Sequence, residues 1–221
     1  MHIELYSIDV KDVKSPSGSL RAERAAITRR RIAQAARTLF ASRGYTATTL
    51  LAIAIDAGVA VQTVYAVYGS KANILRALGE ELVNDPPADA AYVEALAASD
   101  TAEALTRFAH SIRLRWQTGH DIVVIGADAA SADPQIRIEM DRLLSARRRG
   151  IAELARSLAR HDAGLADERR TAAVIEALTL PELYGNLVGG HGWTADAYEL
   201  WLATALRRLV MEAELVRPGP D

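Results

Sequence analysis

A run of polar side chains near residue 62 holds the chemistry best suited to recognising another molecule. Gln62 and Thr63 are adjacent, and Tyr65 and Lys71 follow them. The amide of Gln62 can form two hydrogen bonds with the edge of an adenine base in a DNA major groove. The phenol of Tyr65 and the ammonium of Lys71 can contact backbone phosphates. These side chains suggest binding of double-stranded DNA, whereas an ordinary surface position is the alternative for Gln62.

Two short helices joined by a tight turn are predicted to carry this polar run. The two apolar stripes consist of Ile53, Ala54 and Ala57, and of Val61, Val64 and Tyr65 or Tyr68. Stripes with this spacing are typical of helices that bury one face. Gly58 stands where the first helix must stop, because glycine adopts the left-handed conformation of a helix end without steric cost. The pattern predicts a helix-turn-helix, whose second helix enters the major groove.

Basic and hydroxyl side chains before the motif are further candidates for phosphate contacts. Residues 21–31 contain five arginines at the start of a predicted helix, although a solvated charged face is the alternative. Thr48 or Thr49 is placed to cap the first helix of the motif, where the helix N-terminus also attracts a phosphate. The complete set of candidate DNA-binding residues is Arg29, Thr48, Thr49, Gln62, Thr63, Tyr65, Tyr68 and Lys71.

The charge is distributed unevenly along the 221 residues, although the net charge is only −2. Residues 1–78 contain eleven Lys and Arg against five Asp and Glu, whereas the remainder contains 15 against 23. A basic first third and an acidic remainder suit a DNA-binding head attached to a body that should not adhere to DNA.

The composition argues against several other classes of protein. The chain has no Cys, which excludes disulfides, zinc–thiolate sites and a cysteine nucleophile. The histidines show no metal-ligand spacing and no catalytic constellation stands out, so we expect no enzyme, no metal site and no cofactor. No apolar run approaches the length of a membrane span and no leader is evident, so we expect a cytoplasmic protein without a membrane partner.

The motif and its flanks resemble the TetR family of bacterial transcriptional regulators. The matching residues are Phe40, Gly44, Tyr45, Ala47, Thr48, Thr49, Ile53, Ala54, Ala57, Gly58, Val59, Thr63, Tyr65, Tyr68, Ser70 and Lys71. The resemblance implies a ligand-responsive regulator, acting as a repressor, that binds a palindromic operator as a homodimer. It also implies release from DNA by a small, mostly apolar effector.

The sequence departs from the family pattern at several positions of the motif. Ala60 replaces a capping Ser or Thr, and Ala66 and Val67 replace side chains that donate to phosphates. Leu51 and Ile55 are apolar on a face that is normally charged. These departures keep open an alternative: an all-helical small-molecule-binding or interaction protein with weakened or lost DNA binding.

The whole chain is predicted to be all-α and to have three parts. These are a flexible tail (residues 1–20), the helix-turn-helix DNA-binding domain (21–71) and the ligand-binding and dimerisation domain (72–221). Helices are expected over residues 70–83, 88–98, 133–160 and 194–216. Gly119 is expected to break a helix that begins near residue 101, with a short helix over 121–130 after it. Pro181 is expected to kink a helix over residues 166–188.

The body contains candidates for an effector pocket and for a dimer interface. The pocket candidates are Tyr92, Phe108, His110, Ile112, Trp116, Met140 and Tyr184, with ordinary core packing as the alternative. The interface candidates, on the wide apolar stripes of the last two helices, are Leu183, Leu187, Tyr198, Trp201, Leu202, Leu206 and Leu209. Stripes of this width can face both the core and a second copy. Arg147, Arg148 and Arg149 are expected to be solvated.

Overall fold

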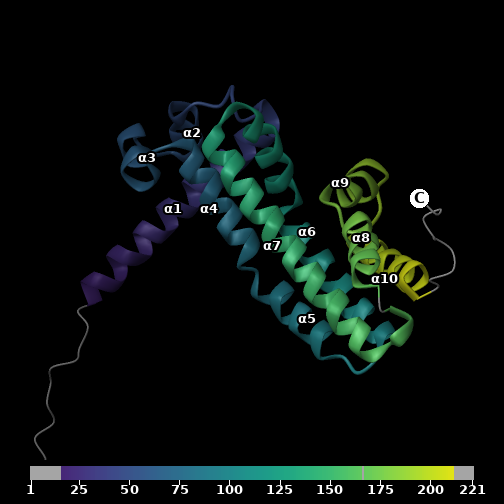
Figure 1. Cartoon of the computed structure of the whole chain (residues 1–221). Coiled ribbons are helices and arrows are strands. Elements are labelled where there is room, and N and C mark those ends of the chain that lie inside the picture. The colour runs from purple at the N-terminus through teal and green to yellow at the C-terminus, as the bar shows by residue number, and fades with distance from the viewer. Residues whose placement is uncertain (1–15, 166, 212–221) are drawn as a thin grey trace, which may run out of the picture.

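The computed structural model describes residues 16–165 and 167–211, and every regular element among them is a helix (Figure 1). In chain order the elements are α1 (Pro16–Arg43), α2 (Leu50–Ala57), α3 (Val61–Tyr68), α4 (Lys71–Val83), α5 (Pro86–Ala97), α6 (Thr101–Ala132), α7 (Pro134–His161), the 3-10 turn η1 (Ala163–Leu165), α8 (Glu168–Leu178), α9 (Pro181–Tyr184), the π-helix η2 (Gly185–Gly190) and α10 (Ala195–Met211). The predicted all-α class is confirmed.

The first helix starts earlier than predicted. α1 begins at Pro16, a position that suits proline because the first residue of a helix needs no N–H hydrogen bond. The last five residues of the predicted flexible tail therefore belong to α1, and the first fifteen lie outside the described residues. Residues 20–27 are all exposed, and this end of α1 projects away from α2 and α3 (Figure 1).

Helices α1, α2 and α3 form a head around a shared apolar core. The largest of its fully buried side chains are Ile32, Phe40, Ile53 and Val64. Gly58 ends α2 with a left-handed φ of 64°, and the N–H of Val59 donates to the carbonyl of Ala54 at 3.0 Å. This capping motif closes α2, and α2 and α3 then bend by 108° relative to each other. The predicted helix-turn-helix is confirmed.

Helix α6 is continuous at the centre of the body, and the predicted break at Gly119 is wrong. α6 packs against α4, α5, α7 and α10. Gly119 lies where α6 meets α4, because a Cβ atom there would overlap Cδ1 of Leu82 and lie 3.3 Å from its Cγ. Gly126 makes a similar close contact with the sulfur of Met140 on α7. The two glycines allow close helix packing and do not terminate the helix.

The C-terminal part differs from the prediction at Pro181. α8 ends at Leu178 and Pro181 opens the separate helix α9, because proline lacks the N–H that a continuing helix requires. The expected single kinked helix over residues 166–188 is therefore replaced by α8, α9 and η2. The carbonyl of Thr179, at this break, accepts a hydrogen bond from Nε1 of Trp116 at 3.1 Å. α10 is described as far as Met211, and residues 212–221 lie outside the described part.

Side-chain contacts of Arg37 and Tyr45 join the head to the body in addition to α4, and Nη2 of Arg37 also donates to the carbonyl of Thr118 on α6 at 2.6 Å. Arg37 of α1 forms a bidentate pair with Asp121 of α6, with Nε–Oδ2 at 2.7 Å and Nη2–Oδ1 at 2.6 Å. Burial acts to raise the pKa of Asp121, but the hydrogen bonds and charge of Arg37 outweigh it, so this pKa lies below its ordinary value. Tyr45 donates its hydroxyl to Oδ2 of Asp133, the cap of α7, at 3.2 Å. These contacts tie the position of the head to α6 and α7.

Two features are absent from residues 16–165 and 167–211. No single helix there is long and apolar enough to cross a membrane, and α2 with α3 meets the requirements of length and composition only as a bent pair. No group of three or more His, Cys, Asp and Glu side chains is arranged to hold a metal ion.

Candidate DNA-binding surface and ligand cavity

Helix α3 presents a short row of side chains to solvent, and three of them were predicted to bind DNA. Gln62 and Tyr65 are exposed and Thr63 is half-buried, whereas Val64 packs in the core of the head. Gln62 and Thr63 lie in the first turn of α3, where an amide and a hydroxyl can reach base edges when the helix enters a major groove. Ala60 leaves α3 without a side-chain cap.

Two other predicted contacts are used inside the head. The hydroxyl of Thr48 is buried 2.8 Å from the carbonyl of Gly44. Tyr68 is also buried, and it donates its hydroxyl to the carbonyl of Arg29 at 3.1 Å. The DNA-binding assignments of Thr48 and Tyr68 are therefore corrected, because a buried hydroxyl that is already paired is not available to a phosphate. Thr49 remains exposed and caps α2 as predicted.

Lys71 has a structural role that its sequence position did not reveal. Its ammonium donates to the carbonyl of Tyr45 at 2.8 Å and lies 4.5 Å from the centre of the Tyr45 ring. Burial lowers the pKa of Lys71. The side chain therefore connects the start of α4 to the segment before α2, and phosphate binding would compete with these contacts.

Most arginines of the head are exposed cations. Arg29 lies over the Tyr68 ring of α3, with its Cζ atom 4.9 Å from the ring centre. Within the described part of the head, Arg37 is the arginine that has an acidic partner. The remaining ones, Arg21, Arg24, Arg29, Arg30, Arg31 and Arg43, are exposed, and Arg21 and Arg24 belong to the projecting end of α1. A cation such as Arg29 beside α3 contributes the positive potential that attracts a phosphate backbone.

A cavity of about 370 Å³ lies in the body, bounded by α4 to α7 and by the break between α8 and α9. Its wall is mostly apolar, and its volume falls in the range of small-molecule sites. The predicted pocket residues that line it are Tyr92, Phe108, Ile112, Trp116 and Met140. The apolar faces of α5, α6 and α7 therefore line one cavity.

His110 and Tyr184 do not line this cavity, and their assignment to the pocket is corrected. His110 points outwards, with its Nδ1 atom 3.0 Å from Oε1 of Glu199 on α10. Tyr184 is buried between His120 and Tyr198, with ring centres 5.1 and 4.9 Å away. These contacts attach α10 and α9 to α6.

Arg147 is a candidate site residue that the sequence did not reveal. It lines the cavity, and its Nη2 atom donates to the carbonyl of Glu176 at 2.9 Å and to the hydroxyl of Thr179 at 2.7 Å. Burial lowers its pKa, while the charge of Glu176 opposes this shift. The expectation of a solvated run is wrong for Arg147, although Arg148 and Arg149 are exposed. A buried cation in an apolar wall can pair with an acidic group of a ligand.

The predicted dimer interface is only partly at the surface. Tyr198, Leu202 and Leu206 are completely buried within the protomer, so their assignment to an interface is wrong. The half-buried members of the set are Leu183, Leu187, Trp201 and Leu209. Leu200 lies outside the predicted stripe but is 72 % exposed on α10. Compared with the predicted stripe, the apolar face of α10 that is available to a second copy therefore lies closer to Leu200.

Comparison with known proteins identifies the head and the architecture. Residues 32–78 match the model of the bacterial regulatory proteins of the tetR family. The fatty acid degradation regulator FadR from Bacillus halodurans superposes with a TM-score of 0.66 at 17 % identity, over 81 % of this chain and 94 % of that chain. NalD, the secondary repressor of the MexAB-OprM multidrug efflux pump in Pseudomonas aeruginosa, superposes with a TM-score of 0.62 at 22 % identity, over 84 % of this chain and 96 % of that chain. The TetR family regulator PfmR from Thermus thermophilus superposes with a TM-score of 0.61 at 22 % identity, over 86 % of this chain and 97 % of that chain.

No curated protein sequence matches the chain. The matched segment is the part that contains the helix-turn-helix, and the similarity to solved regulators extends over the head and the helical body. Residues 32–78 of this protein therefore match the tetR family of bacterial regulatory proteins, and the chain has the fold of solved TetR family transcriptional regulators.

Proposed function

We propose that this protein is a transcriptional repressor that binds a palindromic operator as a homodimer and leaves it when a small, mostly apolar molecule fills the body cavity. The proposed activity is regulation of transcription and involves no catalysis. The observation that carries the proposal is the exposure of Gln62 and Tyr65 on α3, with Thr63 half-buried, next to Arg29, which is exposed and has no acidic partner within the described residues. That combination supplies both parts of DNA recognition, which are contacts to base edges and attraction to phosphates.

The route from cavity to DNA is supported by the position of α4. Leu82 and Val83 at the end of α4 line the cavity, whereas its start follows α3 after Gly69 and Ser70. Leu82 packs directly on Gly119 of α6, so a ligand that pushes on Leu82 can move α4 relative to α6. Such a movement changes the direction in which α3 points, and the two recognition helices of a dimer then no longer fit successive major grooves.

Dimer formation is supported by the apolar surface of the last helices. Leu200 is 72 % exposed on α10, and Trp201 and Leu209 of the same helix are half-buried. A second copy that covers this face would bury apolar area on both protomers, which is the usual driving force for a homodimer. The geometry then requires α3 of the two copies to lie about 34–36 Å apart, or somewhat further.

The decisive experiment measures binding to the DNA upstream of the protein's own gene and to a scrambled duplex of equal length, by fluorescence anisotropy over a range of salt. Gln62→Ala should cost about 1–3 kcal/mol on the upstream DNA and little on the scrambled duplex, because one good base contact is worth that much. Arg30→Ala should weaken binding to both and lower the slope of log affinity against log salt by about 1 per protomer.

Arg148→Ala is the matched control. It removes the same charge from an exposed position on the body, so the salt slope should not change. Equal effects of Gln62→Ala on both DNAs would show that Gln62 does not read bases.

The second candidate function, a helical small-molecule-binding protein that no longer reads DNA, is favoured by the surface of α2 and the start of α3. Leu51 and Ile55 are 58 % and 72 % exposed, where a charged side chain would support backbone binding, and Ala60 provides no cap. Wild-type protein that binds neither duplex at low salt would establish this second function and reject the first.

A further inference from the structure

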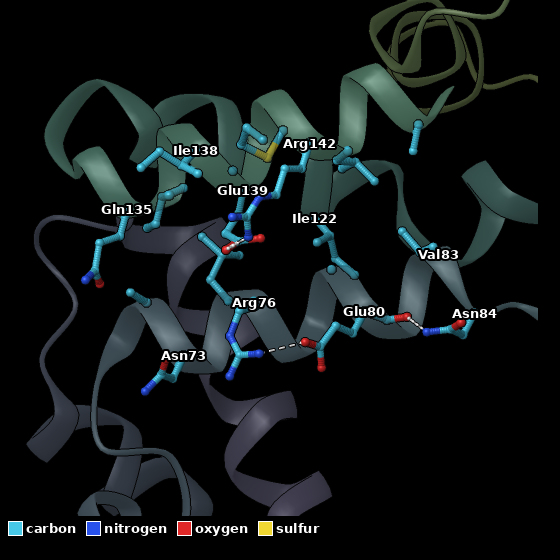
Figure 2. A pocket seen from close by; sticks show the side chains of 18 of the residues that line it. Asn73, Arg76, Glu80, Val83, Asn84, Ile122, Gln135, Ile138, Glu139 and Arg142 are labelled. Carbon is cyan, nitrogen blue, oxygen red and sulfur yellow. Dashed lines mark hydrogen bonds and ion pairs between the residues drawn. The ribbon is translucent and has the colours of Figure 1, made fainter. Parts of the chain in front are cut away.

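An open groove of about 730 Å³ runs between α4 and α7, outside the cavity described above. Figure 2 shows Asn73, Arg76, Glu80 and Asn84 coming from α4 on one side, and Gln135, Ile138, Glu139 and Arg142 coming from α7 on the other. Ile122 and Gly126 of α6 contribute to the lining. The residues of α7 that line the groove extend from Gln135 to Arg149, about 21 Å of helix at 1.5 Å per residue.

The groove and the cavity are neighbours with a common wall. Val83, Met140, Leu143 and Ala146 line both. Met140 is held in this wall by close contact of its sulfur with Gly126. The aromatic residues of the cavity, among them Trp116, do not line the groove. Apart from this common wall, the groove is therefore lined by a different set of residues from the cavity.

The chemistry of the groove is an apolar surface with cations. Apolar side chains with exposed area line it, among them Val83 and Ile138, which are 44 % and 53 % exposed, and the half-buried Leu143. Arg142 and Arg149 both line it and are seven residues apart on α7, which places them two turns apart on one face. Arg149 is exposed and makes no hydrogen bond or ion pair within the described residues.

The acidic side chains in the groove have local partners. Glu139 pairs with Arg142 at 2.9 Å, and Glu80 pairs with Arg76 at 2.8 Å, each within its own helix. Exposed pairs of this kind are weak and are readily exchanged for a better partner. Arg149 is left as a cation without a local counter-charge, at one end of an elongated apolar surface.

We propose that the groove between α4 and α7 is a second ligand site, which takes an elongated amphipathic carboxylate. The apolar chain lies along Val83, Ile138 and Leu143, and the carboxylate pairs with Arg149, with Arg142 as a second cation on the same face of α7. This site is additional to the body cavity of the proposed function, and ligand binding there does not depend on whether the head binds DNA.

Gly79 provides the means to test the site without disturbing the fold. It lies on α4 in the groove lining, and a Cβ atom added there would meet no atom within 4 Å. Gly79→Phe therefore places a ring in the groove, whereas Gly79→Ala adds only a methyl group. The second matched pair is Arg149→Gln, in the groove, and Arg148→Gln, whose side chain pairs with Glu176 of α8 instead.

The experiment is isothermal titration of the full-length protein with decanoate, and with decylammonium as the probe of opposite charge. Decanoate should bind more tightly than decylammonium. Its affinity should fall about tenfold or more in both groove variants, because Gly79→Phe fills the space for the chain and Arg149→Gln removes a charge-assisted contact. Gly79→Ala and Arg148→Gln should bind decanoate as the wild type does.

Three results would overturn the proposal. Equal decanoate affinity of Gly79→Phe and Gly79→Ala would place the decanoate chain elsewhere, including in the body cavity. Equal affinities for decylammonium and decanoate would reject the preference for an acidic ligand. Absence of any decanoate binding to the wild type would reject the site, whatever the outcome of the DNA measurements.

Discussion

Two glycine-to-alanine substitutions in helix interiors should have opposite effects on stability. Gly79 of α4 faces open space, whereas a Cβ atom at Gly119 of α6 would overlap Cδ1 of Leu82. Both substitutions replace a residue that destabilises a helix, so both should gain about 0.8–1.0 kcal/mol in helix propensity. They differ only in what the added methyl group meets.

The expected magnitude follows from that contact. Gly79→Ala should keep its full gain, whereas overpacking at Gly119 should cost about 1–3 kcal/mol. Gly119→Ala should therefore range from neutral to about 2 kcal/mol less stable than the wild type, and the two variants should differ by about 1–3 kcal/mol. Leu82 lines the body cavity, so turning its side chain into the cavity is the least costly relief, and the cavity should shrink.

Thermal unfolding by circular dichroism, at one protein concentration, measures this difference. A change of 1 kcal/mol shifts the Tm of a chain of this length by about 2–4 °C, so the variants should melt at least about 2 °C apart, with Gly79→Ala the higher. Equal increases in Tm for both variants would refute the close packing of α4 on α6, and with it the route by which Leu82 couples the cavity to α4.

Two further predictions concern the assembly and the link between head and body. Leu200→Glu should shift sedimentation equilibrium towards the monomer, whereas Val93→Glu, the same change at a position 61 % exposed on α5, should not; an unchanged dimer in Leu200→Glu would exclude this face. Asp121→Asn should destabilise the protein by about 1–3 kcal/mol at pH 7, because it removes a charge-assisted pair with Arg37. The folded-state pKa of Asp121 is lowered, so this stabilisation is fully present above the unfolded pKa of about 3.9 and is lost as the pH falls from there through the lower folded-state pKa. The difference between variant and wild type in urea unfolding should therefore shrink as the pH is lowered below about 3.9, and a difference that does not shrink would contradict the pairing.

The head could be predicted in detail because its signals are local. Gly58 ends α2 with its own backbone, and the spacing of Ile53, Ala57 and Val64 fixes which sides of α2 and α3 are buried. Caps such as Thr49 and Ser70 act on residues three positions away, and both were found at the predicted helix starts. Each of these features depends on neighbours within one or two helical turns.

The errors occurred where a residue's role depends on a distant segment. Glycine is a residue type that disfavours helix, yet Leu82 of α4 packs against Gly119 and α6 continues. Arg147 belongs to a run of three arginines, and its hydrogen bonds to the carbonyl of Glu176 and the hydroxyl of Thr179 distinguish it from its neighbours. An apolar stripe shows that Leu206 is buried but does not show whether its own core or a second copy covers it.

The uninterrupted course of α1 has a mechanical consequence. The helix continues from its projecting end into the head core and to Arg37, which is fixed to α6. At 1.5 Å per residue, Pro16 lies about 31 Å along the axis from Arg37, so a tilt of about 10° at that point moves the tip by about 5 Å. That displacement exceeds the spacing of about 3.4 Å between successive base pairs. A small rotation of α1 at Arg37 therefore moves the projecting N-terminal end of the helix by more than one base-pair step.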